Sequence, residues 1–187
     1  MEVHPFIGKT KFKRATVLVL GSFPDFKQDT YGDWYFADNQ QSYSWAIMAD
    51  MYNAKFDSNQ HKFEFCSIHN FAITDLFLKL ERSNKSKQDQ LKVVEYNVEE
   101  LLEILNTNNI YKILFTSKVV ESHFQILLQQ KESLNRRMRN IITKLIPSPS
   151  AKANSSISRL KDFKQLKSNQ FTTLDYRKKL YRKELIG

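Results

Sequence analysis

The alternation of apolar and polar positions along the chain predicts four strands separated by helices. Short apolar runs rich in β-branched residues occur at 16–20, 71–77, 111–116 and 141–146. Continuous runs of this length are typical of strands buried on both faces of a parallel sheet. Apolar residues at helical spacing predict helices over 43–52, 94–105, 119–130 and 174–185, and the polar run 81–90 is expected to form an exposed loop.

The order of these elements predicts the fold class. Strands that alternate with helices require right-handed crossovers, which cover both faces of a parallel sheet. We therefore expect an α/β protein, a three-layer α/β/α sandwich with a central, mostly parallel four-stranded sheet. No repeat or linker interrupts the 187 residues, so a single domain, 1–187, ending in a basic helix is expected. The buried side of helix 43–52 should carry Trp45, Ile47, Met48 and Met51.

Three segments should meet where the strands end. In sheets of this kind, ligands bind outside the carboxyl ends of the strands. Residues 21–25, the Thr74-Asp75 corner and residues 147–154 follow three of the predicted strands. They are distant in sequence, yet the topology predicts that they line one crevice.

Composition excludes several classes of protein. Apolar residues make up 41% of the chain and charged residues 26%, as in a globular protein. No apolar run approaches the roughly 20 residues that span a bilayer, and residues 1–5 lack the pattern of a signal peptide. Cys66 is the only cysteine, which rules out an internal disulfide and suits the cytoplasm.

Positive charge is concentrated near the C-terminus. The chain has a formal net charge of +9, and residues 151–187 hold ten Lys or Arg against three Asp or Glu. A polyphosphate partner such as nucleic acid would gain from this charge through counterion release. A solvated, solubilising face is an equally ordinary explanation.

The three convergent segments carry motifs that resemble the uracil-DNA glycosylase superfamily. Gly21-Ser22-Phe23-Pro24 after the first strand resembles its Gly-x-x-Pro motif, and Ile73-Thr74-Asp75 resembles the end of its second strand. Residues 146–150 (Ile-Pro-Ser-Pro-Ser) with 153–155 (Ala-Asn-Ser) resemble its third motif. The likeness covers about residues 14–165 and is nearest to the hypoxanthine-DNA glycosylase and mismatch-specific glycosylase-like branch. It implies hydrolysis of the N-glycosidic bond of a flipped-out deaminated base, uracil or hypoxanthine, in DNA repair.

Departures from the motifs leave a second interpretation open. Most of the superfamily has Asp, Glu or Asn where this chain has Phe23, and Ser42 falls on the catalytic Asn of the branch. Leu145 and Ile146 stand where a histidine often precedes the third motif. The alternative is therefore a catalytically silent member of the superfamily that binds nucleic acid.

The resemblance assigns candidate roles to residues of this chain. Asp25, Asp38 and Asn39 are the catalytic candidates, although Asp25 would serve equally well as a turn or helix cap. The base pocket would be formed by Gly21, Ser22, Phe23, Pro24, Tyr35 and Asp75, and Asp75 would either read a base edge or hold a neighbouring loop. The rings at 23, 31, 34, 35 and 36 would stack on a base or belong to the core. The phosphate-binding set would be Ser148, Pro149, Ser150, Lys152 and Asn154.

The expected partner is DNA, double- or single-stranded, bound by a monomer that is not associated with a membrane. The four histidines share no metal-ligand spacing, so neither a metal nor another cofactor is expected. A nucleotide-binding domain of another class lacks support, because neither GxGxxG nor GxxxxGK[ST] occurs.

Overall fold

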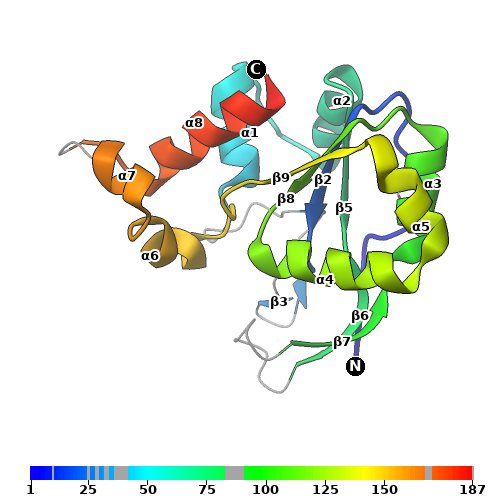
Figure 1. Ribbon diagram of the computed structural model, residues 1–187. Coiled ribbons are helices and arrows are strands. Elements are labelled where there is room, and N and C mark those ends of the chain that lie inside the picture. The colour runs from blue at the N-terminus through cyan, green and yellow to red at the C-terminus, as the bar shows by residue number, and fades with distance from the viewer. Residues whose placement is uncertain are drawn as a thin grey trace.

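The computed structural model describes residues 1–9, 11–24, 26–27, 30–31, 34–35, 42–82, 91–166 and 170–186. A four-stranded sheet in the order β5-β2-β8-β9 forms its centre (Figure 1). Its strands are β2 (Val17–Gly21), β5 (Phe71–Asp75), β8 (Lys112–Phe115) and β9 (Ile142–Leu145). All three pairings are parallel. The predicted α/β class and its four-stranded parallel sheet are confirmed.

Helices cover both faces of this sheet. Successive side chains of β2 and β8 point to opposite faces, and each face packs against helices. Leu20 is paired with Phe115, whose ring lies 5.2 Å from that of Phe124 in α4 (Lys118–Gln130). On the opposite face, Val19 lines a small cavity together with residues of α1 (Ser44–Tyr52) and α8 (Thr173–Leu185). The sheet is therefore the middle layer of three.

A second, antiparallel sheet was not predicted. It contains β1 (Glu2–Val3), β6 (Phe77–Arg82) and β7 (Leu91–Tyr96) in the order β1-β6-β7. Only Leu76 separates β5 from β6, so the expected strand 71–77 belongs to two sheets. The expected loop 81–90 begins too early, because residues 81 and 82 belong to β6. Residues 83–90 lie outside the described part of the chain, and β7 begins directly after them at Leu91.

The helix expected over 94–105 is misplaced. The observed helix, α3, is Val98–Thr107, and residues 94–96 are the end of β7. Tyr96 is paired with Phe77 across the antiparallel sheet. A strand partner therefore outweighs the helical spacing in this segment. Leu101 and Leu105 still form the buried stripe that suggested a helix.

The helices predicted over 43–52, 119–130 and 174–185 are confirmed as α1, α4 and α8. The four residues predicted to face inward from α1 are buried. Further elements that the sequence did not predict are α2 (Asn59–Ile68), α5 (Glu132–Arg137), α6 (Asn154–Ile157), α7 (Lys161–Leu166) and the short strands β3 (Phe26–Lys27) and β4 (Thr30–Tyr31).

The C-terminal helices α6, α7 and α8 gather at one side of the sheet (Figure 1). They share a small apolar cluster of their own, formed by Ile157, Phe163 and Tyr176. Two ion pairs connect α8 to α1 and to β8. Lys178 lies 3.0 Å from Asp50 of α1, and the Lys112 ammonium of β8 lies 3.7 Å from the Glu184 carboxylate.

Within the described ranges, no helix is both long and apolar enough to cross a membrane.

Candidate functional site at the carboxyl edge of the sheet

The three segments singled out in the sequence all begin at the carboxyl edge of the parallel sheet. Gly21 and Asp75 are partners in register, and Gly21 O accepts a hydrogen bond from Leu76 N (2.9 Å). The third segment follows β9, whose pairing with β8 ends at Leu145. It is joined to the start of α1, because Tyr43 N donates to Pro149 O (2.9 Å) and Ser42 forms a bridge with Ser150. The topology thus brings the predicted segments to one edge.

Aromatic rings fill the space next to the first segment. The ring of His4 lies 5.0 Å from that of Phe23 and 5.5 Å from that of Tyr35. The Phe6 ring is 5.7 Å from that of Tyr35. Phe23 and Tyr35, two of the proposed base-pocket residues, are therefore buried against the N-terminal segment. Ser22 is half-buried and Pro24 is buried.

Asp75 has a partner that the sequence analysis missed, because 71 residues separate the two. His4 Nε2 lies 2.9 Å from Asp75 Oδ2, and both side chains are almost fully buried. His4 Nδ1 accepts hydrogen bonds from Phe6 N (3.1 Å) and Ile7 N (3.2 Å). Because Nδ1 is an acceptor, the ring hydrogen is on Nε2, which donates to the carboxylate. No described residue donates a hydrogen bond to Asp75 Oδ1.

A buried polar network extends from this corner into α3. Glu100 accepts hydrogen bonds from Gly8 N (2.9 Å), from Asn97 Nδ2 (3.0 Å) and from the Thr74 hydroxyl. Asn97 Nδ2 also donates to Asp75 O (2.9 Å). Glu100 thereby connects the N-terminal segment, β5 and α3. None of these hydrogen bonds was predictable from residue spacing.

The Tyr35 hydroxyl lies in this network without a hydrogen-bond partner of acceptable geometry, and it is the sole such buried side-chain atom among the described residues. Burial and then the negative charge of Glu100 raise the pKa of Tyr35. The phenol is therefore neutral at physiological pH.

Arg177 of α8 holds the third segment through hydrogen bonds. Its guanidinium donates from Nε to Ser148 O (2.7 Å) and from Nη2 to Ser150 O (2.8 Å). Nη1 donates to Asn154 Oδ1 (2.8 Å), so the side chain of this proposed phosphate ligand faces inward. Tyr181 donates from its hydroxyl to Pro147 O (3.2 Å). Arg177 is one of the ten basic residues in 151–187, yet its side chain is fully buried.

The serine hydroxyls of the same loop form local turns. Ser148 Oγ accepts from Ser150 N (3.3 Å), and Ser150 Oγ accepts from Lys152 N (3.3 Å). Each hydroxyl keeps its own hydrogen as a donor. Lys152 is exposed. The loop therefore offers two hydroxyl donors and, at Lys152, an exposed positive charge.

The proposed catalytic residues Asp25, Asp38 and Asn39 lie outside the described residues, as does Phe36. No group of three or more His, Cys, Asp or Glu side chains that could hold a metal ion is present in the described ranges.

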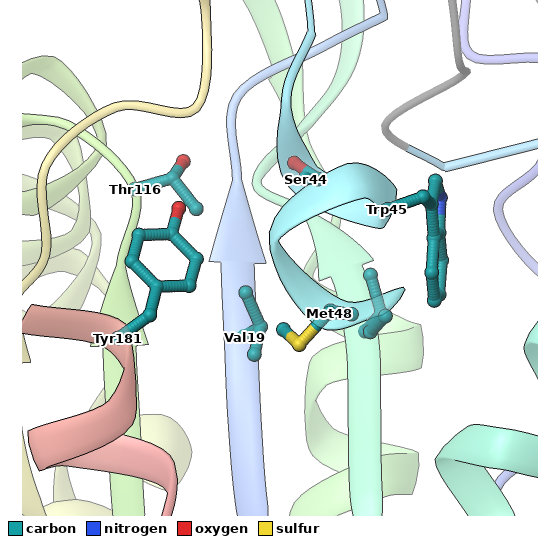
Figure 2. Close-up of a pocket in the computed structure, with 7 residues that line it drawn as sticks. Val19, Ser44, Trp45, Met48, Thr116 and Tyr181 are labelled. Atoms are coloured by element: carbon teal, nitrogen blue, oxygen red, sulfur yellow. The ribbon is translucent and has the colours of Figure 1, made fainter. Parts of the chain in front are cut away.

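A small cavity lies deeper, between the sheet and the helices α1 and α8. Figure 2 shows Val19 of β2 between Met48 of α1 and the ring of Tyr181, which line the cavity together. The cavity volume is about 10 Å³, close to the minimum for one water molecule. This cavity is too small for a nucleobase.

Comparison with known proteins identifies a similar fold. The solution NMR structure of a candidate uracil DNA glycosylase from Methanosarcina acetivorans superposes with a TM-score of 0.56, at 14% sequence identity, over 94% of this chain and 93% of that chain. No protein-family model and no curated protein matches the chain. The chain has the α/β fold of the Methanosarcina protein, with a parallel four-stranded sheet flanked by helices.

Proposed function

We propose that the chain is a DNA glycosylase of the uracil-DNA glycosylase superfamily, nearest to the hypoxanthine-DNA glycosylase branch. Its reaction would be hydrolysis of the N-glycosidic bond of a deaminated base, uracil or hypoxanthine. The supporting observation is that all three motif segments begin at one edge of a sheet whose fold matches that of the Methanosarcina protein.

The chemistry requires a site that stabilises separated charges. Breaking the glycosidic bond leaves positive charge on the sugar and negative charge on the departing base. The base leaves with the electron pair of the broken bond, and a water molecule bonds to C1′. The proton that this water loses neutralises the departed base. Asp25, Asp38 or Asn39 would orient the water or stabilise the sugar, and Asp75 would face the base.

The loop after β9 would hold the flipped nucleotide. Flipping a base out of the duplex costs a few kcal/mol, which contacts to the flanking phosphates offset. The hydroxyls of Ser148 and Ser150, which keep their hydrogens as donors, and the exposed Lys152 side chain suit this role.

Base release tests the proposal directly. Duplexes that carry a single uracil or hypoxanthine are incubated with excess protein, treated with alkali and examined for strand cleavage. We expect cleavage at the damaged position of one substrate or both, and none with undamaged DNA. The absence of any release from either duplex would contradict the catalytic proposal.

The catalytic candidates are distinguished by variants that remove the carboxylate charge or the side-chain amide. Among Asp25→Asn, Asp38→Asn and Asn39→Ala, at least one should lower kcat by about 10²–10³. The matched control is Asp57→Asn, an exposed carboxylate before α2 that forms an ion pair with Lys55. If all three variants retain full activity, the assignment of these residues is wrong.

A DNA-binding protein without glycosylase activity is the second candidate function. The burial of Phe23 against His4 favours it, because an apolar buried ring neither orients a water molecule nor contacts a sugar cation. Under this function the protein retains salt-sensitive DNA binding and releases no base.

We also propose that the protein acts as a cytoplasmic monomer without a metal ion or other cofactor. Sedimentation should give one species near 22.1 kDa. Base release should survive a strong chelator, and loss of activity that added metal restores would contradict this part of the proposal.

A further inference from the structure

Arg177 differs from the other basic residues of α8. Its side chain is fully buried, whereas Lys179, Arg182 and Lys183 on the same helix are exposed. No carboxylate among the described residues forms an ion pair with it. A guanidinium buried without a counter-charge is costly and requires complete hydrogen bonding.

The hydrogen-bond partners of Arg177 include oxygen atoms of the loop after β9. Two of its nitrogens donate to Ser148 O and Ser150 O, which flank Pro149 on either side. A third bond reaches Asn154 Oδ1, and the guanidinium carbon lies 5.2 Å from the centre of the Tyr43 ring. The loop is thus fixed at both ends and to the start of α1.

These bonds leave the serine hydroxyls of the loop as donors. Arg177 holds the carbonyl oxygens of Ser148 and Ser150. The hydroxyls of the two serines accept from backbone N–H groups of the loop, so each keeps its hydrogen as a donor. Both serines are half-buried, so each remains partly accessible.

The charge of Arg177 acts in the same direction. The guanidinium contacts the loop directly through the Ser148 and Ser150 carbonyls, and burial lowers the pKa of Arg177 without removing its charge. An anion bound to the loop would supply the counter-charge that the interior lacks.

We infer that Arg177 is the positioning residue of the phosphate-binding loop, holding the carbonyls of Ser148 and Ser150 so that the hydroxyls of these two serines can donate to a DNA phosphate. The inference rests on the proposed function, because it takes this loop as the phosphate contact. Arg177 itself does not touch the phosphate.

The test separates positioning from direct contact through the salt dependence of binding. Affinity for a fluorescently labelled duplex with one uracil is measured between about 50 and 200 mM salt for wild type and variants. A residue that contacts phosphate lowers the slope of log affinity against log salt by about 0.9 when removed. We expect this change for Lys152→Ala.

Arg177→Met should lower the affinity about tenfold or more at every salt concentration while leaving the slope unchanged. Arg177→Lys should not restore affinity, since a single ammonium cannot bridge both carbonyls in the fixed geometry of the guanidinium. Arg182→Met on the exposed side of α8 is the matched control, and it should not show a loss of this kind.

Three outcomes overturn the inference. The first is wild-type affinity in Arg177→Met. The second is a salt slope of Arg177→Met that is smaller than that of the wild type by about 0.9, the value for one phosphate contact. The third is full rescue of affinity by Arg177→Lys. If Arg177→Met does not fold, Tyr181→Phe, which removes one bond to Pro147 O, should give a smaller loss with the same slope. Failure of the wild-type protein to bind the duplex would instead contradict the proposed function.

Discussion

Asp75 shows how much a single side chain can depend on a distant partner. Its carboxylate is buried at the end of β5, and its one described hydrogen-bond partner is the Nε2–H of His4. A buried carboxylate that loses its donor is strongly destabilising, whereas a pair replaced together by apolar groups is often tolerated. The N-terminal segment therefore contributes to the site as well as to the second sheet.

Removing His4 should destabilise the protein. We expect His4→Ala to lower the free energy of unfolding by about 2–4 kcal/mol, measured by urea denaturation. The double variant His4→Phe/Asp75→Leu should lose less than the sum of its two single variants. His61→Ala, at an exposed position of α2, is the control. Equal effects of the two histidine substitutions would mean that the buried pair contributes nothing to stability.

Tyr35 gives the opposite expectation. Its buried hydroxyl has no partner of acceptable geometry, so Tyr35→Phe should leave the free energy of unfolding unchanged or raise it by up to about 1 kcal/mol. Thermal and urea unfolding would measure the change. A loss above about 1 kcal/mol would show that the hydroxyl is bonded to Thr74 or Glu100 in solution.

At the scale of elements, α8 depends on its first turn. Thr172 and Asp175 form a reciprocal capping box, in which Asp175 Oδ2 accepts from Thr172 N (2.8 Å). Hydrogen bonds from the Thr172 side chain and backbone lower the pKa of Asp175. The cap matters beyond α8, because this helix carries Arg177 and Tyr181 to the loop after β9.

The capping box should make part of the stability pH-dependent. A carboxyl with a lowered folded-state pKa stabilises fully above its unfolded pKa of about 3.9, and this stabilisation is lost as the pH falls through the folded value. Because solvent screens this exposed carboxylate, Asp175→Asn should cost only about 0.5–1 kcal/mol at pH 7 and progressively less in acid. Urea titrations at several pH values measure the difference. A constant difference at all pH values would contradict this account.

Three of the four strands that the sequence predicted share a common property. β2, β5 and β8 are continuous apolar runs, and burial on both faces is a strong local signal. β6 and β7 mix lysine, glutamate and arginine with apolar residues, and β1 has two residues, so their pairing depends on contacts that no local pattern records. For this reason the predicted helix 94–105 wrongly included the end of β7.

The candidate site divides in the same way. The convergence of the three segments followed from topology, because parallel strands end at one edge. His4 and Arg177 could not be predicted as partners of Asp75 and the Ser148–Ser150 turn, since 71 and 29 residues separate the bonded groups. The burial of Arg177 could not be predicted either, because a basic helix has no sequence pattern that marks which cation faces the interior.

For the whole molecule, the charge of +9 sets the expected response to salt. If several exposed cations meet phosphates, log affinity for DNA should fall linearly with log salt, with a slope of about −0.9 per contact. Fluorescence anisotropy at a series of salt concentrations measures the slope. An affinity that is independent of salt would assign the positive charge to solubility.

The short strand β1 pairs with β6, and His4 immediately after it binds Asp75. During synthesis, the residues of β1 leave the ribosome before any of their partners exist. They must remain unpaired until more than seventy further residues have emerged. We therefore expect the corner around Asp75 to close late, once the hairpin of β6 and β7 has formed.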